Sequence, residues 1–209
     1  MGKGQLAVHA AQAILNSPHA TLKCLVSPRN ESSLFASLLP IARDAYVPSG
    51  NLHEMAHLIA GADVVMCSSF PTIIPEKILS SVRRVVNFHY SPLPKYRGVR
   101  PINWALENDE SSHGVTLHVI DSGIDTGPIL DQIKFPIDSA SDEVLDVYLR
   151  CVKAGMSLFD KHMDLMLTIP GEVQDSCQSS YYSKSDSENL RKFARLSRRN
   201  QRVLESVPL

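Results

Sequence analysis

Two polar side chains at the end of a short apolar segment are the first candidates for chemistry. Residues 85–89 read VVNFH, which is typical of a buried strand, so Asn87 and His89 alternate with Phe88 and point to the same side. An amide can donate hydrogen bonds to a developing oxyanion, and a histidine can exchange a proton near neutral pH. Because residues 90–98 contain two prolines and a glycine, we expect a shaped loop after this strand, at the edge of a ligand crevice.

A second polar cluster follows the next apolar segment. Residues 114–130 read GVTLHVIDSGIDTGPIL, a strand that runs into a turn with Asp121, Gly123, Asp125 and Gly127. Glycines beside carboxylates permit positive φ angles and close approach of the backbone to a ligand. Either aspartate could pair with a histidine across the crevice and raise its basicity. Taken singly, a histidine at a strand end and an Asp-Gly turn are both common structural features.

The elements that must position these residues alternate between helices and strands. Helical patterns cover residues 6–15, 52–60 and a long stretch from 139–142 to 167, with Ser141 as the expected N-cap. Strand patterns cover 23–26, 63–67, 84–88, 115–120 and 128–135. The order indicates βαβ units, an α/β fold and a mainly parallel sheet. The long helix carries a stripe that we expect to face the core: Leu145, Tyr148, Leu149, Val152, Met156 and Phe159.

Composition limits the class of protein. The chain has 209 residues, a formal net charge of −1 and 44% hydrophobic residues, which fits one folded domain with a short appendage. No apolar run is long enough to span a bilayer, and no signal-peptide pattern opens the chain, so we expect a cytoplasmic protein without membrane partners. The four cysteines stand far apart, which argues against a zinc site and a disulfide scaffold.

The segment after the long helix differs from the rest of the chain. Residues 174–189 are polar and rich in serine, and the last residues carry a cluster of arginines on a helical pattern. We therefore predict a domain over residues 1–170 and a polar C-terminal extension with a basic helix over 171–209. A nucleic-acid arm is the alternative to a solvated terminal helix, although Phe193 is the lone aromatic residue in this cluster that could stack on a base.

Taken together, the motifs resemble those of the formyltransferase family that uses 10-formyltetrahydrofolate. The resemblance extends over roughly residues 2 to 167 and includes the methionyl-tRNA, glycinamide ribonucleotide and nucleotide-sugar branches. Its motifs occur in the expected order: Asn87-x-His89-x-Ser91-x-Leu93-Pro94, Tyr96-Arg97-Gly98, Pro101, Trp104-Ala105, Gly114-Val115-Thr116 and Asp125-Thr126-Gly127.

The resemblance implies a Rossmann-like three-layer sandwich and a site for formyl transfer. The family's catalytic residues fall on Asn87, His89 and Asp125, and 10-formyltetrahydrofolate is the implied co-substrate, with no metal. The implied pterin pocket and substrate loop are as follows: Phe70, Thr72, Ile73, Ile74, Val119, Asp121 and Gly123 for the pocket, and Ser91, Tyr96, Arg97 and Gly98 for the loop. Core packing is the alternative role for Ile73 and Ile74.

Two questions remain open at this level. Family members usually begin with an apolar strand before a glycine turn, whereas Met1-Gly2-Lys3-Gly4 already sits at that turn, so we expect the first strand to be missing. The favoured acceptor is a small-molecule amine, above all a nucleotide-linked amino sugar. Methionyl-tRNA, glycinamide ribonucleotide, water (as in a deformylase) and a non-catalytic folate-binding domain are the alternatives, and a homodimer is left open.

Overall fold

The computed structural model describes residues 1, 4–26, 46–47, 56, 59–70 and 73–191. The helices are α1 (Gln5–Asn16), α4 (Glu76–Leu79), α5 (Pro101–Glu107) and α6 (Val144–His162). The strands are β1 (Leu25–Val26), β2 (Tyr46–Val47), β3 (Val64–Ser68), β4 (Arg84–His89), β5 (Arg97–Gly98), β6 (Ser112–Val119), β7 (Ile129–Pro136) and β8 (Tyr181–Tyr182). Short 3₁₀ turns cover Met163–Leu165, Ser176–Gln178 and Asp186–Asn189.

A four-stranded mixed sheet forms the centre of the molecule, in the order β3-β4-β6-β7. β3 and β4 are parallel, whereas β6 runs antiparallel to both β4 and β7. The pairs β1–β2 and β5–β8 form two further small parallel sheets. The predicted α/β class is confirmed. The antiparallel pairing of β4 and β6 starts the turn at residues 120–128 beside Val85 and Val86, near the start of β4.

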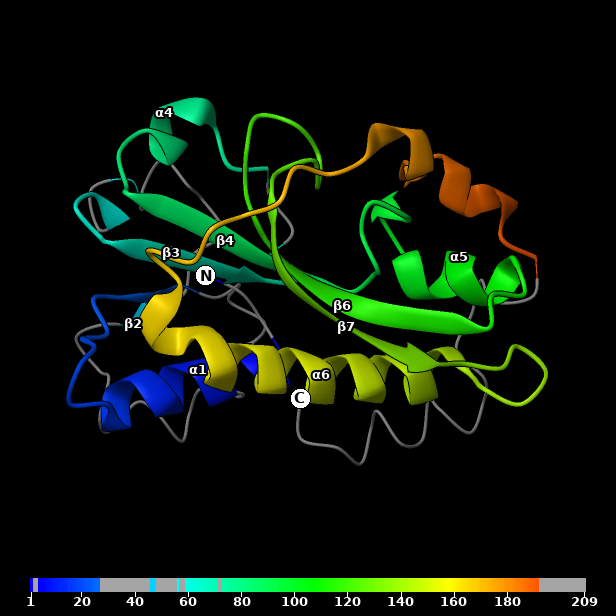
Figure 1. Ribbon diagram of the computed structural model, residues 1–209, viewed down its shortest axis with the longest axis horizontal. Helices are drawn as coiled ribbons and strands as arrows, with labels where there is room; N and C mark the ends of the chain where they lie inside the picture. Colours follow the sequence, from blue (N-terminus) through cyan, green and yellow to red (C-terminus); the bar gives the residue numbers. More distant parts are fainter. Residues whose placement is uncertain (2–3, 27–45, 48–55, 57–58, 71–72, 192–209) are drawn as a thin grey trace.

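Helices α1 and α6 lie side by side beneath the central sheet (Figure 1). The main core fills the space between them and the sheet, and it includes Leu6, Val86, Leu117, Leu158 and Phe159. This close-packed layer fixes β4 and β6, which carry the polar side chains considered below.

Two expectations about α6 are wrong. Its N-cap is Glu143, which forms a capping box with Asp146, and not Ser141. The Ser141 hydroxyl donates instead to the Asp138 carboxylate at 2.8 Å, within a turn that precedes the helix. Leu149 is 43% exposed and lies outside the core stripe, because the buried face follows Leu145, Val152 and Phe159 with the small Gly155 and Ala154 between them.

Some expectations concern residues outside the described part of the chain. These are most of the helix predicted over 52–60, the residue Thr72 and the arginine-rich end beyond residue 191. Within the described part, residues 171–190 pack along the domain, and β8 pairs with β5. None of the four cysteines takes part in a disulfide bond. None of the described helices is both long and apolar enough to cross a bilayer.

Candidate active site

A cavity of about 560 Å³ lies beside the C-terminal half of β4 and the end of β6, which face each other at the pair Asn87–His118. The β6–β7 turn closes one side of it, and the segment from β5 to the start of α5 closes another. Six of the polar side chains at its wall come from three separate parts of the chain: Asn87, His89, His118, Asp121, Asp125 and Lys184. This convergence of buried titratable groups in a concave site marks it as the candidate active site.

The antiparallel register of β4 and β6 places Asn87 directly opposite His118. The Asn87 Nδ2 atom lies 3.2 Å from His118 Nε2, and His118 Nδ1 lies 2.8 Å from the Val119 carbonyl oxygen. The carbonyl can accept only from an Nδ1–H, so in neutral His118 the Nε2 lone pair accepts from the Asn87 amide. One N–H of the Asn87 amide is thereby used, and the other is left for a ligand.

His89 is 7% exposed, and each of its ring nitrogens faces a polar group. Its Nε2–H donates to the Tyr96 carbonyl at 2.8 Å, while Nδ1 lies 3.5 Å from the Asp125 carboxylate. Burial lowers the pKa of His89 below its ordinary value of 6.5, although the nearby Asp125 charge acts in the opposite direction. Neutral His89 therefore predominates near pH 7, with its Nδ1 lone pair free to accept a proton beside a carboxylate.

Asp125 adopts a left-handed backbone conformation with φ of 54°. Burial acts to raise the pKa of Asp125, but the charges of His89 and His118 and the Gly98 N–H outweigh it, so this pKa is well below 3.8. The Gly98 N–H donates to Asp125 Oδ2 at 2.9 Å. The carboxylate, whose side chain is 15% exposed, is thus kept ionised.

Gln174 fixes the backbone of this turn from the C-terminal segment. Its side-chain amide donates to the carbonyl oxygens of Asp125 and Gly127 at 2.9 and 2.7 Å. The Arg97 guanidinium donates to the Gln174 side-chain oxygen at 2.7 Å. Gly127 is required here, because a Cβ at this position would lie 1.9 Å from the Val119 carbonyl oxygen.

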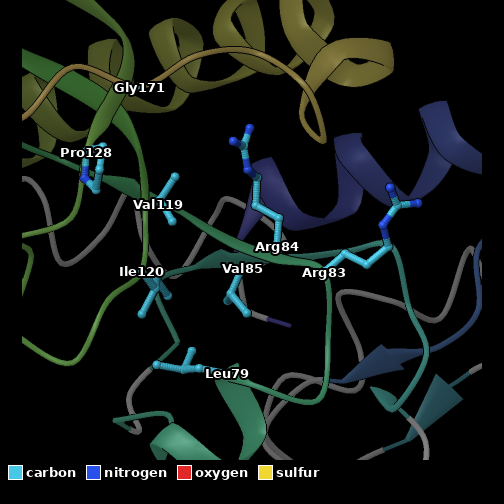
Figure 2. Close-up of a pocket in the computed structure, with 8 residues that line it drawn as sticks. All are labelled: Leu79, Arg83, Arg84, Val85, Val119, Ile120, Pro128 and Gly171. Carbon is cyan, nitrogen blue, oxygen red and sulfur yellow. The ribbon is translucent and has the colours of Figure 1, made fainter.

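The residues predicted for the pterin pocket divide into two groups. Phe70, Ile73, Ile74, Asp121 and Gly123 line the cavity, and Ile73 is 76% exposed while Ile74 is buried. The Val119 side chain lies instead in a neighbouring cavity of about 310 Å³. Figure 2 shows that cavity between the start of β4, the end of β6 and the segment at Gly171.

Of the four predicted loop residues, Gly98 lines the cavity and the other three lie behind it. The Ser91 hydroxyl donates to the Lys95 carbonyl, and the Tyr96 hydroxyl donates to Glu110. Arg97 reaches Gln174, as described above. These contacts tie the loop to its own backbone, to Glu110 and to Gln174, so the side chains of Ser91, Tyr96 and Arg97 position the site and do not form its surface.

Four residues of the site were not among those predicted: His118, Gln174, Tyr181 and Lys184. The signal for His118 was present, since it lies on the same face of β6 as the buried Thr116 and directly before the polar turn. The other three belong to the polar segment after α6, whose path over the cavity no local pattern reveals. Among the described residues, no group of three or more histidines, cysteines or carboxylates is placed to hold a metal ion.

Comparisons with known proteins show which family the chain belongs to. Residues 3–162 match the family model described as formyl transferase. A methionyl-tRNA formyltransferase from Trichlorobacter lovleyi is 35% identical over 122 residues, 57% of this chain and 38% of the relative. The chain thus spans well under half the length of that curated relative.

Two solved structures are similar over 88% of the chain. One is WlaRD, described as a sugar 3N-formyl transferase in the presence of dTDP and 5-N-formyl-THF, with 32% identity, a TM-score of 0.74 and 68% of its chain covered. The other is an N-formyltransferase from Helicobacter canadensis in complex with folinic acid and dTDP-3-aminofucose, with 31% identity, a TM-score of 0.73 and 70% covered.

Proposed function

We propose that this chain, which belongs to the formyl transferase family, transfers a formyl group from 10-formyltetrahydrofolate to the primary amine of a nucleotide-linked amino sugar. One observation carries the proposal: Asn87, His89 and Asp125 meet at the wall of one cavity, with a neutral buried histidine beside an ionised carboxylate. When an amine attacks a formyl carbon, an amide can donate to the oxygen that becomes negative, a base can take the proton of the amine, and an anion can stabilise the protonated base.

The free N–H of Asn87 donates to the oxygen that becomes negative when the amine attacks. His89 Nδ1 accepts the proton that the amine must lose, which forms an imidazolium ion. Asp125, 3.5 Å away, stabilises that ion, and the Tyr96 carbonyl already holds the opposite nitrogen. The proton then passes to the folate nitrogen as the carbon–nitrogen bond breaks, so His89 returns to its neutral state.

The folate ring is assigned to the part of the cavity between Phe70, Ile73 and Ile74 and the β6–β7 turn. Phe70, Ile73 and Ile74 form its apolar wall, and Asp121 and Gly123 lie on the opposite side. An aromatic, partly polar ring suits a wall of this composition. The two solved relatives named above hold folate derivatives, which supports this assignment.

The acceptor is assigned to the side formed by the C-terminal segment. Tyr181, which is 52% exposed, and Lys184 line the cavity there and offer an aromatic face and a cation. A nucleotide supplies a base that stacks and phosphates that pair with a cation. The alternative acceptor is methionyl-tRNA, because the curated relative from Trichlorobacter lovleyi is a methionyl-tRNA formyltransferase.

The test is a turnover assay with 10-formyltetrahydrofolate and separate amine acceptors, read by the mass of the product. The acceptors are dTDP- and UDP-linked amino sugars, glycinamide ribonucleotide and charged methionyl-tRNA, with a sample that lacks any acceptor. We expect an added formyl mass on one of the nucleotide sugars. Formylated tRNA in place of a formylated nucleotide sugar would overturn the proposed acceptor. Release of formate alone would show that the chain is a hydrolase and not a transferase. A folded chain that binds folate and releases neither product would overturn the activity.

A further inference from the structure

Gln174 is buried in a stretch of chain that is otherwise exposed. It is 8% exposed, whereas the other residues of 171–179 are open to solvent. Its side-chain amide is fully paired: Nε2 donates to the carbonyl oxygens of Asp125 and Gly127, and Oε1 accepts from Nε and Nη2 of Arg97 at 3.1 and 2.7 Å. Because carbonyls face one end of the amide and N–H groups face the other, only one orientation satisfies all of these bonds. The side chain is therefore held in one place.

Arg97 links this amide to the carboxylate of Asp125. The residue after Arg97 in β5 is Gly98, whose N–H donates to Asp125 Oδ2 at 2.9 Å. Asp125 is therefore held at two points, its main-chain carbonyl by Gln174 and its carboxylate by Gly98. The side chain of Arg97 joins the two holding residues to each other. Asp125, Gln174, Arg97 and Gly98 thus form a closed ring of contacts, which we call the Asp125 ring.

The backbone at Asp125 depends on this support. Its φ of 54° lies in the left-handed region, which a residue other than glycine adopts at an energetic cost. Residues 121–124 before it are exposed, and the side-chain hydrogen bonds of Asp121 remain inside the turn. The Asp125 ring connects the turn to β5 and to the C-terminal segment. It thereby sets the carboxylate 3.5 Å from His89 Nδ1 and 3.6 Å from His118 Nε2.

We propose that Gln174 is a positioning residue for the formyl transfer proposed above, and that Arg97 holds it in place. Neither residue lines the cavity, so both act on the reaction through Asp125 and not through contact with a substrate. The carboxylate then lies beside His89 Nδ1 before the amine loses its proton, and the imidazolium ion forms next to a charge that is already oriented. The inference rests on the proposed function for its effect on turnover, but not for its effect on the ionisation of His89.

The first test replaces the amide of Gln174 by an apolar side chain of the same length. Gln174→Met loses the bonds to both carbonyls of the turn and to Arg97. The matched control is Gln178→Met, on the same segment, where the glutamine is exposed and donates to the Asp175 carboxylate. We expect kcat to fall about tenfold or more in Gln174→Met, with a change of less than about twofold in the KM for the folate, and no change in the control. Circular dichroism at the assay temperature checks that both variants are folded.

A double-mutant cycle separates positioning of the carboxylate from a general loosening of the site. Gln174→Met is combined with Asp125→Asn, in which the carboxylate is already absent. Because Gln174 acts through that carboxylate, adding Gln174→Met should lower kcat by less than about twofold further. An equal fall of kcat in the presence and absence of the carboxylate would overturn the proposal. If Gln174→Met does not fold, Arg97→Met serves the same cycle, since it leaves the glutamine in place and removes the residue that holds it.

The ionisation of His89 gives a readout that needs no turnover. Its pKa is measured in each variant by NMR titration of the imidazole. In the unaltered chain burial lowers this pKa, the charge of Asp125 raises it and the charge of His118 lowers it. We expect the pKa of His89 in Gln174→Met to move toward its value in Asp125→Asn, and in Gln178→Met to equal that of the unaltered chain. No movement in Gln174→Met would overturn the proposal. This result decides on Gln174 even if the unaltered chain transfers no formyl group, an outcome that would overturn the proposed function alone.

Discussion

The charge of Asp125 can be tested without disturbing its shape, because Asn is isosteric and tolerates the left-handed conformation found there. We expect Asp125→Asn to lower kcat/KM by about 100-fold or more, since the imidazolium of His89 loses its partner. Removing the carboxylate also lowers the pKa of His89 further. The acid limb of the pH–rate profile, which reports loss of the neutral base, should therefore move to lower pH.

The control for this variant is the pH profile of the unaltered chain over the same range. Activity there should rise as the pH increases through the pKa of His89, below 6.5, and then level off. An acid limb that moves to higher pH in Asp125→Asn, or that stays in place with full activity, would contradict the pairing of these two residues.

Lys184 is the residue on which recognition of a phosphate-bearing acceptor depends in this account. Lys184→Gln should raise the KM for the acceptor about tenfold, with a much smaller change in kcat and in the KM for the folate, because the lysine lies on the acceptor side of the cavity. Lys153→Gln, on the exposed face of α6, is the matched control. Steady-state kinetics with each substrate varied in turn measure both. Equal KM values of the two variants for the acceptor would show that Lys184 does not take part in acceptor binding.

At the scale of elements, the contact between β5 and β8 positions the Asp125 carboxylate. Gly98 has φ of 90°, and a Cβ on it would lie 2.2 Å from the Tyr182 carbonyl oxygen. Gly98→Ala should therefore force β8 away from β5 and weaken the 2.9 Å bond from the Gly98 N–H to Asp125. We expect a loss of about 2 to 3 kcal/mol in the free energy of unfolding and a large loss of turnover.

Gly61→Ala separates backbone strain from this clash. Gly61 also has a positive φ, 73°, but its nearest neighbour would be the flexible end of Lys23 at 3.8 Å. Gly61→Ala should lower the free energy of unfolding, measured in urea, by about 1 kcal/mol. Its turnover, at a temperature where the chain stays folded, should not change. Similar turnover in both variants would mean that β5 and β8 do not position Asp125.

At the scale of the whole molecule, a buried histidine on β6 makes stability depend on pH. His113 is fully buried, and its Nε2–H donates to the Tyr90 carbonyl at 2.8 Å. Burial lowers the pKa of His113 from 6.5 to about 4. Between these values the unfolded chain binds a proton that the folded chain does not. Stability is therefore lost as the pH falls from 6.5 to 4, by about 3 kcal/mol from this residue.

His113→Asn keeps a donor for the Tyr90 carbonyl and does not titrate. Urea unfolding at pH 7, 6, 5 and 4 should show a clearly flatter loss of stability in the variant, whatever its stability at pH 7. If the free energy of unfolding falls with pH by the same amount in the variant and the unaltered chain, groups other than His113 cause the loss of stability in acid.

Much of this organisation could be predicted from local sequence patterns. The strand over 84–88, the polar pair Asn87 and His89 and the turn with Asp125 follow from apolar runs and turn residues, and the structure places all three residues at one cavity. His118 was missed because its role depends on the antiparallel register that sets it opposite Asn87. Gln174 was missed because it reaches Asp125 from 49 residues away, a distance over which no local pattern carries information.

The helix α6 shows the other limit of sequence patterns. Ser141 and Glu143 are both acceptable caps, and the choice between them depends on the turn at Asp138, which takes the serine hydroxyl. The role of the extension over 171–209 as a separate unit stays a prediction. Its described part contributes Gln174, Tyr181 and Lys184 to the site, so the site itself spans the predicted boundary at residue 170.

The most direct test of the account is the rate of formyl transfer from 10-formyltetrahydrofolate in His89→Asn, measured under single-turnover conditions with folate binding determined on the same sample. His113→Asn, at a buried histidine that does not line the cavity, is the control for removing an imidazole from the core. We predict that His89→Asn binds the folate normally and transfers formyl at least about 100-fold more slowly than the control. Transfer by His89→Asn at the rate of the control would contradict the central claim that this histidine takes the proton of the amine.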